Sequence, residues 1–63
     1  MSKVSEVVRR IKKETNCYKL RDGANHEIWI NPETGKKFTI PRHYGKELPT
    51  KTAKSILKDA GLS

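Results

Sequence analysis

The sequence contains two histidines, His26 and His43, and the residues around His26 indicate a reactive side chain. His26 closely follows Asp22-Gly23, a dipeptide typical of tight hairpin turns because glycine accepts the positive φ that such turns need. The residues after it, 27–30, have the apolar composition of a strand. His26 is therefore predicted at a hairpin corner, at the start of a strand. Since an imidazole titrates near neutral pH, we predict that His26 is a proton-transfer group, general base or general acid.

Positive charge dominates the composition. Fourteen lysines and arginines stand against seven acidic residues, which gives a formal net charge of +7 on 63 residues. A field of this sign attracts polyanions and speeds their encounter with the protein. A basic surface can also serve solubility alone. Charge by itself leaves both interpretations open.

The most regular basic residues lie near the C-terminus. Lys51, Lys54 and Lys58 are three and four residues apart, so on a helix they form one cationic ridge. The preceding loop, residues 42–49, adds basic and imidazole side chains at Arg42, His43 and Lys46. We predict that these five lysines and arginines contact a bound polyanion. The alternative is that the ridge is the solvated face of a helix.

Apolar periodicity predicts two helices around three strands. Helical spacing from Val4 to Ile11 gives the first helix, with Ser2 as its N-cap. A closing helix is predicted to begin at Pro49 or Thr50 and to stop before a terminating glycine at position 61. Three stretches are predicted as strands, at residues 17–21, from 26 to 30 or 31, and at 37–40.

Strand alternation assigns side chains to opposite faces of the sheet. His26 and Ile28 share one face, whereas Glu27 and Trp29 share the other, which we expect to point outward. Because neighbouring strand residues point in opposite directions, Glu27 is not expected to pair with His26. In the third strand, Phe38 and Ile40 are predicted on the inner face.

These elements predict an α+β fold of the order αβββα, in which both helices cover one face of a three-stranded antiparallel sheet. Residues 1–63 are expected to form one domain. The single cysteine, Cys17, excludes an internal disulfide, and no spacing of cysteines and histidines indicates a metal. The sequence lacks an apolar run long enough to span a membrane and lacks a signal peptide, so we expect a cytoplasmic protein without a cofactor.

This order of elements, with a basic closing helix, resembles the double-stranded-RNA-binding fold. Within that fold the sequence resembles the HicA toxins of HicAB toxin–antitoxin systems. The resemblance rests on segments that occur in the family's order: Gly-Ala-Asn-His-Glu-Ile-Trp at 23–29, Asn-Pro at 31–32, Ile-Pro-Arg-His at 40–43, Gly-Lys-Glu-Leu-Pro at 45–49, and Ala-Lys-Ser-Ile-Leu-Lys-Asp-Ala-Gly-Leu at 53–62.

The resemblance implies a small endoribonuclease that cleaves mRNA without a metal and is neutralised by a cognate HicB-type antitoxin. Such a protein is expected to be a monomer when free and a hetero-oligomer with its antitoxin. The family's essential histidine falls on His26, and the glycine that supports it falls on Gly23. Many relatives have one residue between this glycine and histidine, whereas this chain has Ala24 and Asn25.

RNA can be cut without a metal because its own 2′-OH is an internal nucleophile. His26 would move the proton and basic side chains would stabilise the developing charge. His43 is a candidate second proton-transfer group or a phosphate contact. The alternative is a hydrogen-bonded His26 with a structural role, in a non-catalytic RNA-binding module that reads duplex shape. Trp29, which is expected to point outward, is a candidate for stacking on a base or for contacting a protein partner.

Overall fold

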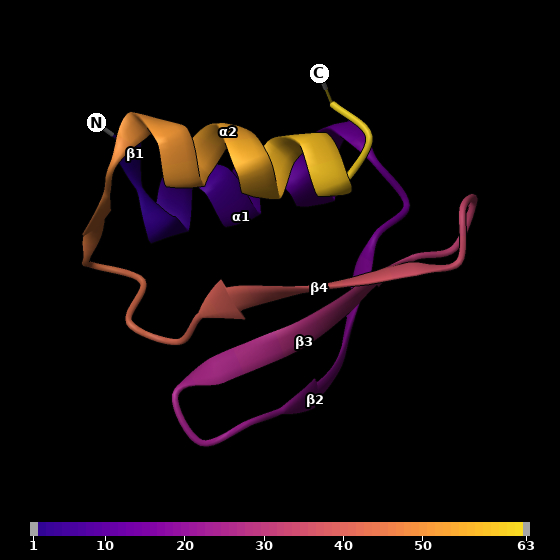
Figure 1. Cartoon of the computed structure of the whole chain (residues 1–63), viewed down its shortest axis with the longest axis horizontal. Helices are drawn as coiled ribbons and strands as arrows, with labels where there is room; N and C mark the ends of the chain where they lie inside the picture. The colour runs from indigo at the N-terminus through magenta and orange to yellow at the C-terminus, as the bar shows by residue number, and fades with distance from the viewer. Residues whose placement is uncertain (1, 63) are drawn as a thin grey trace.

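The structure is a computed structural model and describes residues 2–62. Two helices accompany a three-stranded sheet and a short two-stranded sheet (Figure 1). The helices are α1 (Val4–Glu14) and α2 (Thr50–Asp59), and the strands are β1 (Ser2–Lys3), β2 (Tyr18–Asp22), β3 (His26–Asn31), β4 (Lys36–Pro41) and β5 (Glu47–Leu48). The predicted α+β class and the order helix, three strands, helix are confirmed. The two-residue strands β1 and β5 were not predicted.

The larger sheet is an antiparallel meander with β3 in its centre and β4 at one edge. His26 at the start of β3 pairs with Pro41 at the end of β4. The register between β2 and β3 shifts between Lys19 and Arg21, so Leu20 has no direct partner at this bulge.

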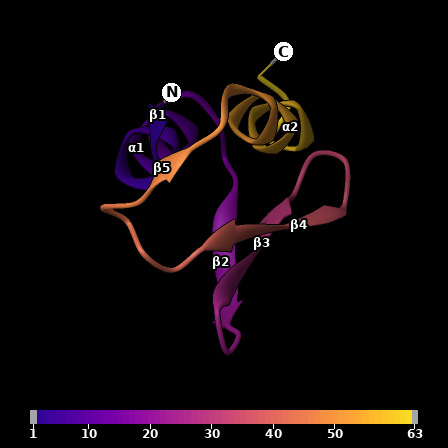
Figure 2. The same cartoon turned by 60° about the vertical axis from the view of Figure 1, so that its left-hand side comes forward.

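Both helices lie on the same face of this sheet, as predicted (Figure 1 and Figure 2). Each helix turns an apolar stripe toward the sheet, and the stripes meet the sheet in a single cluster of buried side chains. The helices contribute Val4, Val7, Val8, Ile11, Ala53 and Ile56, and the sheet contributes Trp29, Phe38 and Ile40. Cys17, which precedes β2, is also buried in this core.

The face of β3 that meets the helices is the one that the sequence analysis took as outward. The alternation itself is as predicted, but Trp29 is only 1% exposed and Glu27 only 7%, whereas His26 is exposed on the other face. The prediction of an outward Trp29 is therefore wrong. Trp29 pairs across the ladder with buried Phe38, and its indole Nε1–H donates to Glu27 Oε1 at 3.0 Å, so its polar atom is satisfied inside the core.

The buried carboxylate of Glu27 is satisfied by two donors. The indole of Trp29 and the Tyr44 hydroxyl, at 2.7 Å, both donate to its Oε1. A buried charge is tolerated only when such partners replace water. Burial, together with the hydrogen bond to Glu27, raises the pKa of Tyr44 to about 12, so the fold favours the neutral phenol. The network ties the centre of the sheet to the loop at residues 42–46.

That loop also caps α1. The prediction of Ser2 as N-cap is wrong, because Ser2 lies in β1 and the N-terminus of α1 has no side-chain cap within residues 2–62. Instead, the Val4 N–H donates to the Lys46 carbonyl and the Ser5 N–H donates to the Tyr44 carbonyl, each at 2.9 Å. Backbone from the far half of the chain therefore replaces a local cap.

The closing helix begins at Thr50 and is terminated at Gly61, as predicted. Gly61 has a φ of 91°. Its N–H donates to the Lys58 carbonyl, and the Leu62 N–H donates to the Leu57 carbonyl at 2.8 Å, a pairing typical of a glycine-ended helix. Within the described residues, neither helix has the length and apolar character needed to cross a membrane.

Replacing Tyr44 by phenylalanine tests the buried network. The Tyr44→Phe variant leaves Glu27 with one donor fewer, so we expect the free energy of unfolding to fall by about 1–3 kcal/mol. Urea unfolding at pH 7, followed by circular dichroism, measures this change.

The matched control is Tyr18→Phe, because Tyr18 is 51% exposed and its substitution should change stability by less than about 0.5 kcal/mol. Equal urea midpoints for the two variants would show that the hydroxyl of Tyr44 does not support the fold. Since the fold raises this pKa, its contribution is complete below the ordinary tyrosine pKa of about 10 and is lost as the pH rises through about 12.

Candidate active site

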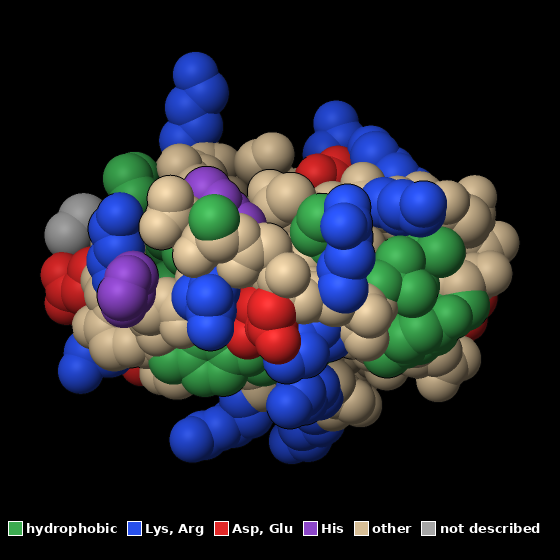
Figure 3. Space-filling view, turned by 90° about the horizontal axis from the view of Figure 1, so that it is seen from below, with side chains coloured by type: hydrophobic (Ala, Val, Ile, Leu, Met, Phe, Trp, Pro, Cys, Tyr) green, Lys and Arg blue, Asp and Glu red, His purple; other side chains and the backbone are tan. Residues whose placement is uncertain are grey.

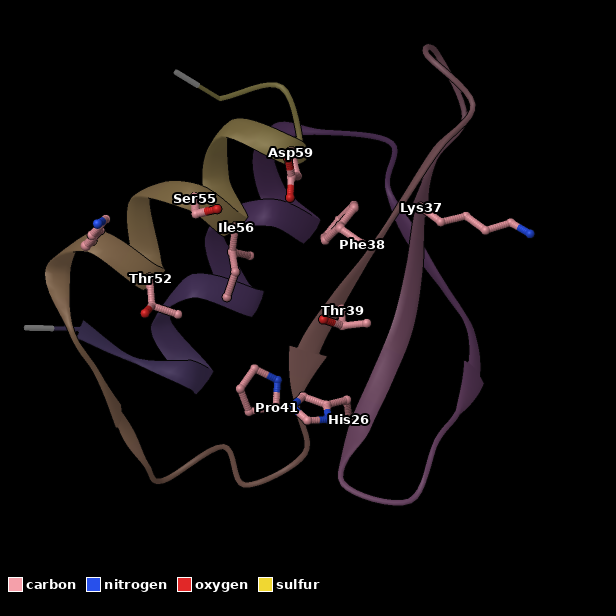
Figure 4. A pocket seen from close by; sticks show the side chains of 10 residues that line it. His26, Lys37, Phe38, Thr39, Pro41, Thr52, Ser55, Ile56 and Asp59 are labelled. Carbon is pink, nitrogen blue, oxygen red and sulfur yellow. The ribbon is translucent and has the colours of Figure 1, made fainter.

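His26 stands at the corner of the β2–β3 hairpin, as predicted. It is the first residue of β3, and its side chain is exposed. The turn before it is closed by the Gly23 N–H, which donates to the His26 carbonyl at 2.6 Å. Figure 4 shows the imidazole beside the ring of Pro41, its partner in the ladder. The imidazole is therefore open to solvent while its backbone is held on both sides.

Gly23 is needed in this turn for a reason other than the predicted one. Positive φ angles occur among the described residues at Gly35 and Gly61, and Gly23 is not one of them. A Cβ atom at position 23 would instead lie 2.8 Å from the backbone oxygen of His26, which is too close for a normal contact. The absence of a side chain lets the two backbone segments approach each other.

Arg42 holds the same turn from the end of β4. Its Nη1 donates to the carbonyls of Gly23 and Ala24, at 3.2 and 3.3 Å, and its backbone N–H donates to the Asn25 carbonyl at 3.3 Å. Arg42 thus supports the two-residue connection before His26. The remaining donors of a guanidinium can still serve an anion, and the predicted contact with a polyanion stays a prediction.

A groove of about 640 Å³ runs between β4 and α2, with His26 among its lining residues (Figure 4). Its bottom is apolar, because buried Phe38 and Ile56 reach it from the sheet and from α2. Polar side chains line its walls, among them Thr39, Thr52, Ser55 and Lys51. Lys37 also borders the groove, but its side chain points away from α2 in Figure 4.

The predicted lysine ridge exists and borders two hollows. Lys51, Lys54 and Lys58 are all exposed and line one depression of about 490 Å³, to which Arg10 of α1 also contributes. Lys51 lines the His26 groove as well. Arg10 was not singled out from the sequence, where it is one of several basic residues on the polar side of its helix. The packing of α1 beside α2 brings it to the ridge.

His43 and Lys46 lie in the loop at residues 42–46, outside the lining of the groove. Both are exposed, and the Lys46 N–H donates to the His43 carbonyl at 3.0 Å. In Figure 3 the two histidines form separate purple patches, each with lysine or arginine side chains nearby. The structure does not bring the two imidazoles side by side.

The surroundings of His26 suit proton transfer next to a bound anion. An exposed imidazole can accept or donate a proton, and Lys51 in the same groove supplies positive charge for a phosphate. Within residues 2–62, no three histidine, cysteine, aspartate or glutamate side chains gather in a group that could hold a metal ion.

Fold and site together define a small basic α+β protein with an exposed histidine in a groove beside a lysine ridge. A family model described as the HicA toxin of bacterial toxin–antitoxin systems matches residues 4–62. The chain therefore belongs to the HicA toxin family, which confirms the resemblance seen in the sequence. It is also similar to the "Probable mRNA interferase HicA 2" of Photorhabdus laumondii, with 44% identity over 43 residues that cover 67% of this chain and 69% of the relative.

The Gly23→Ala variant tests the close approach at the turn. The added methyl group must displace the backbone of His26, and we expect the free energy of unfolding to fall by about 1–3 kcal/mol. Urea unfolding measures the loss, and amide shifts of His26 and Arg42 in nuclear magnetic resonance spectra report the displacement.

Gly45→Ala is the matched control, because no atom lies within 4 Å of a Cβ at position 45. It should be neutral or stabilising by up to about 1 kcal/mol. If both alanines had the same small effect, close backbone contact would not be the reason for glycine at position 23.

Proposed function

We propose that this protein is the toxin of a toxin–antitoxin pair and acts as a metal-independent endoribonuclease, an mRNA interferase, with His26 as its general base or acid. The observation that carries the proposal is the exposed imidazole of His26 in a groove that it shares with Lys51. Membership of the HicA toxin family and the similarity to a probable mRNA interferase support it.

The chemistry follows from what RNA supplies. The 2′-oxygen attacks the adjacent phosphorus, so a 2′-O–P bond forms, the P–O5′ bond breaks, and a cyclic phosphate and a free 5′-hydroxyl result. His26 accepts the 2′-OH proton or donates one to the leaving oxygen. The ammonium of Lys51 stabilises the charge that builds up on the phosphate oxygens. His43, on the separate loop, stays a candidate for the second proton-transfer group.

RNA binds, in this proposal, along the basic side chains that border the groove. The ridge of Lys51, Lys54 and Lys58 provides a track of cations that reaches the His26 groove at Lys51. Arg10, which is paired with Glu14, borders the same depression as the ridge. Arg42 and Lys46 extend the positive surface along the loop on the other side of the hairpin corner. Contacts of this kind position a phosphate backbone without reading its sequence.

The proposed protein partner is a cognate HicB-type antitoxin, with which the toxin, itself a monomer when free, forms a cytoplasmic hetero-oligomer. Membership of a toxin–antitoxin family supports a partner of this kind. Two large apolar side chains of β2, Tyr18 and Leu20, are 51% and 43% exposed. Apolar side chains of this size on a surface are suited to burial against another protein.

A non-catalytic RNA-binding module is the second candidate, because the basic ridge alone would suffice for it. Incubation of the purified protein with long RNA in EDTA separates the two. A ribonuclease of the proposed kind cuts the RNA in the chelator, whereas a binding module retards the RNA and leaves it intact.

The His26→Ala variant should lose RNA cleavage, because no other group takes over the proton at that position. We expect the rate to fall by about 10²–10⁴-fold or more, and growth arrest on expression to disappear. The measurement is cleavage of a labelled RNA in EDTA, with circular dichroism to verify that the variant is folded.

His43→Ala is the parallel variant. A similar loss would assign His43 the second proton transfer, and an unchanged rate would remove it from the mechanism. A folded His26→Ala protein that cleaves RNA at the original rate would refute the proposed role of His26.

The salt dependence of RNA affinity tests whether the lysine ridge contacts phosphates. In a His26→Ala background, which keeps the RNA intact, the double substitution Lys54→Ala and Lys58→Ala should reduce the slope of log affinity against log salt concentration by roughly 1.5, because two phosphate contacts are lost. Fluorescence anisotropy with a labelled single strand measures the slope.

The control removes the same charge elsewhere, with Lys3→Ala and Lys13→Ala. Lys3 lies in β1, and Lys13 lines a different hollow, near Asn31. This pair should leave the slope within about 0.5 of the starting value. Equal reductions in the two double variants would indicate that net charge, and not the ridge, governs binding.

A further inference from the structure

The edge strand β4 offers backbone hydrogen-bonding groups to the groove. In an antiparallel pair, successive residues turn their N–H and C=O groups toward the partner strand and away from it. Arg42 donates its backbone N–H to Asn25, one step beyond the His26–Pro41 pair. The His26 carbonyl instead faces β2, where Gly23 donates to it. The residues of β4 whose backbone groups point away from β3 are therefore Lys37, Thr39 and Pro41.

The same three residues line the groove that contains His26. Proline has no N–H, so Lys37 and Thr39 supply the free donors, and all three residues supply free carbonyls. β4 is the outer strand of its sheet, and no other strand of residues 2–62 pairs with this edge. One wall of the groove thus carries backbone donors and acceptors that form no hydrogen bonds to another strand of residues 2–62.

The opposite wall, formed by α2, carries different chemistry. The hydroxyls of Thr52 and Ser55 and the ammonium of Lys51 line it, and all three residues are exposed. The carboxylate of Asp59 lines its far end, where it is paired with Lys36 at 2.9 Å. Figure 4 shows Thr52 and Ser55 along the side of α2 that faces the groove. Between the two walls lie the apolar groups of Phe38 and Ile56.

We propose that this groove binds one unpaired nucleotide of an RNA strand, next to the phosphate that His26 approaches. The inference rests on the proposed function and adds the place in the fold, between β4 and α2, where an unpaired nucleotide of the substrate lies. A base has apolar faces and an edge on which donors and acceptors alternate. The base faces fit the apolar bottom of the groove, and the base edge fits the N–H and C=O of Thr39. The ribose and phosphate fit the hydroxyls and ammonium of α2.

The size of the groove agrees with this occupant. Its volume of about 640 Å³ lies within the range of roughly 300–1,000 Å³ that small-molecule sites occupy. In a duplex the same base edge is already paired, so double-stranded RNA has no edge to offer Thr39. The groove therefore selects unpaired RNA, in contrast to duplex-reading proteins of similar fold.

A strand of a protein partner is the other occupant that a free sheet edge could accept. Such a strand needs pockets for its alternate side chains. The wall opposite β4 instead presents a lysine and two hydroxyls, which suit a sugar and a phosphate, and a carboxylate, Asp59, whose charge is paired with Lys36. The nucleotide is therefore the occupant that the lining favours.

The proposal is tested with leucine substitutions that fill the groove and leave the net charge unchanged. Anisotropy of the His26→Ala protein is measured with a labelled RNA of about 12 nucleotides, as a single strand and as a duplex with its complement. We expect the single strand to bind at least about tenfold more tightly than the duplex. Ser55→Leu in the same background should weaken single-strand binding by at least about tenfold and leave the salt slope unchanged.

Thr50→Leu is the matched control, because Thr50 is an exposed residue of α2 that does not line the groove, and it should change affinity by less than about twofold. Thr52→Leu is a second groove-filling variant and is measured in parallel, because Thr52 lines the groove alone, whereas Ser55 also borders the depression beside the lysine ridge. Unchanged single-strand affinity in a folded groove-filling variant would overturn the proposal, as would equal or tighter binding of the duplex. Impaired neutralisation by the cognate antitoxin with intact RNA binding would also overturn it and would assign the groove to a partner strand.

Failure of this proposal is distinguishable from failure of the proposed function. The assay measures binding by a protein without His26, so it gives its result whether or not the unaltered protein cleaves RNA. Cleavage by the unaltered protein in EDTA decides the function separately.

Discussion

The buried carboxylate of Glu27 is the constraint on which the rest of the structure depends. A chain of 63 residues without a disulfide has a small core, yet it places a charge there and satisfies it with Trp29 and Tyr44. The tyrosine brings its loop against the sheet, and carbonyls of that loop cap α1. Two hydrogen bonds to one carboxylate thus connect the sheet to the loop, and the loop in turn caps the first helix.

The face of β3 that turns inward determines whether the His26 imidazole is exposed. Because Glu27 points into the core, its neighbour must point outward, and the imidazole becomes exposed at the hairpin corner. The close approach of Gly23 and the hydrogen bonds from Arg42 then hold the backbone on both sides of it. A side chain that acts in proton transfer gains from such support, since small displacements from the reactive geometry are costly.

Much of this could be predicted from the sequence, and the failures have identifiable causes. Helical spacing and the Asp22-Gly23 turn gave correct elements, because these signals are local. Alternation placed Trp29 and His26 on opposite faces, but it contains no information on which face is covered. The Tyr44 hydroxyl that donates to Glu27 lies 17 residues away in the sequence, and the capping carbonyls of α1 lie some forty residues away, so only tertiary packing reveals these partners.

The site shows how a fold associated with duplex binding can present a different surface. A helix ridge alone would favour phosphate contacts from outside an RNA helix. Here the ridge begins at Lys51, which also lines the groove along the free edge of β4. In the proposed function, phosphates that follow the ridge would reach a sheet edge whose outward backbone groups pair with no other strand of residues 2–62, and then the imidazole at its end. Electrostatic attraction by the lysines is non-specific and acts over a distance, whereas hydrogen bonds to the edge of β4 form only at direct contact. For the proposed ribonuclease, the ridge would therefore act first, in capturing an RNA strand, and the sheet edge second, in placing it at His26.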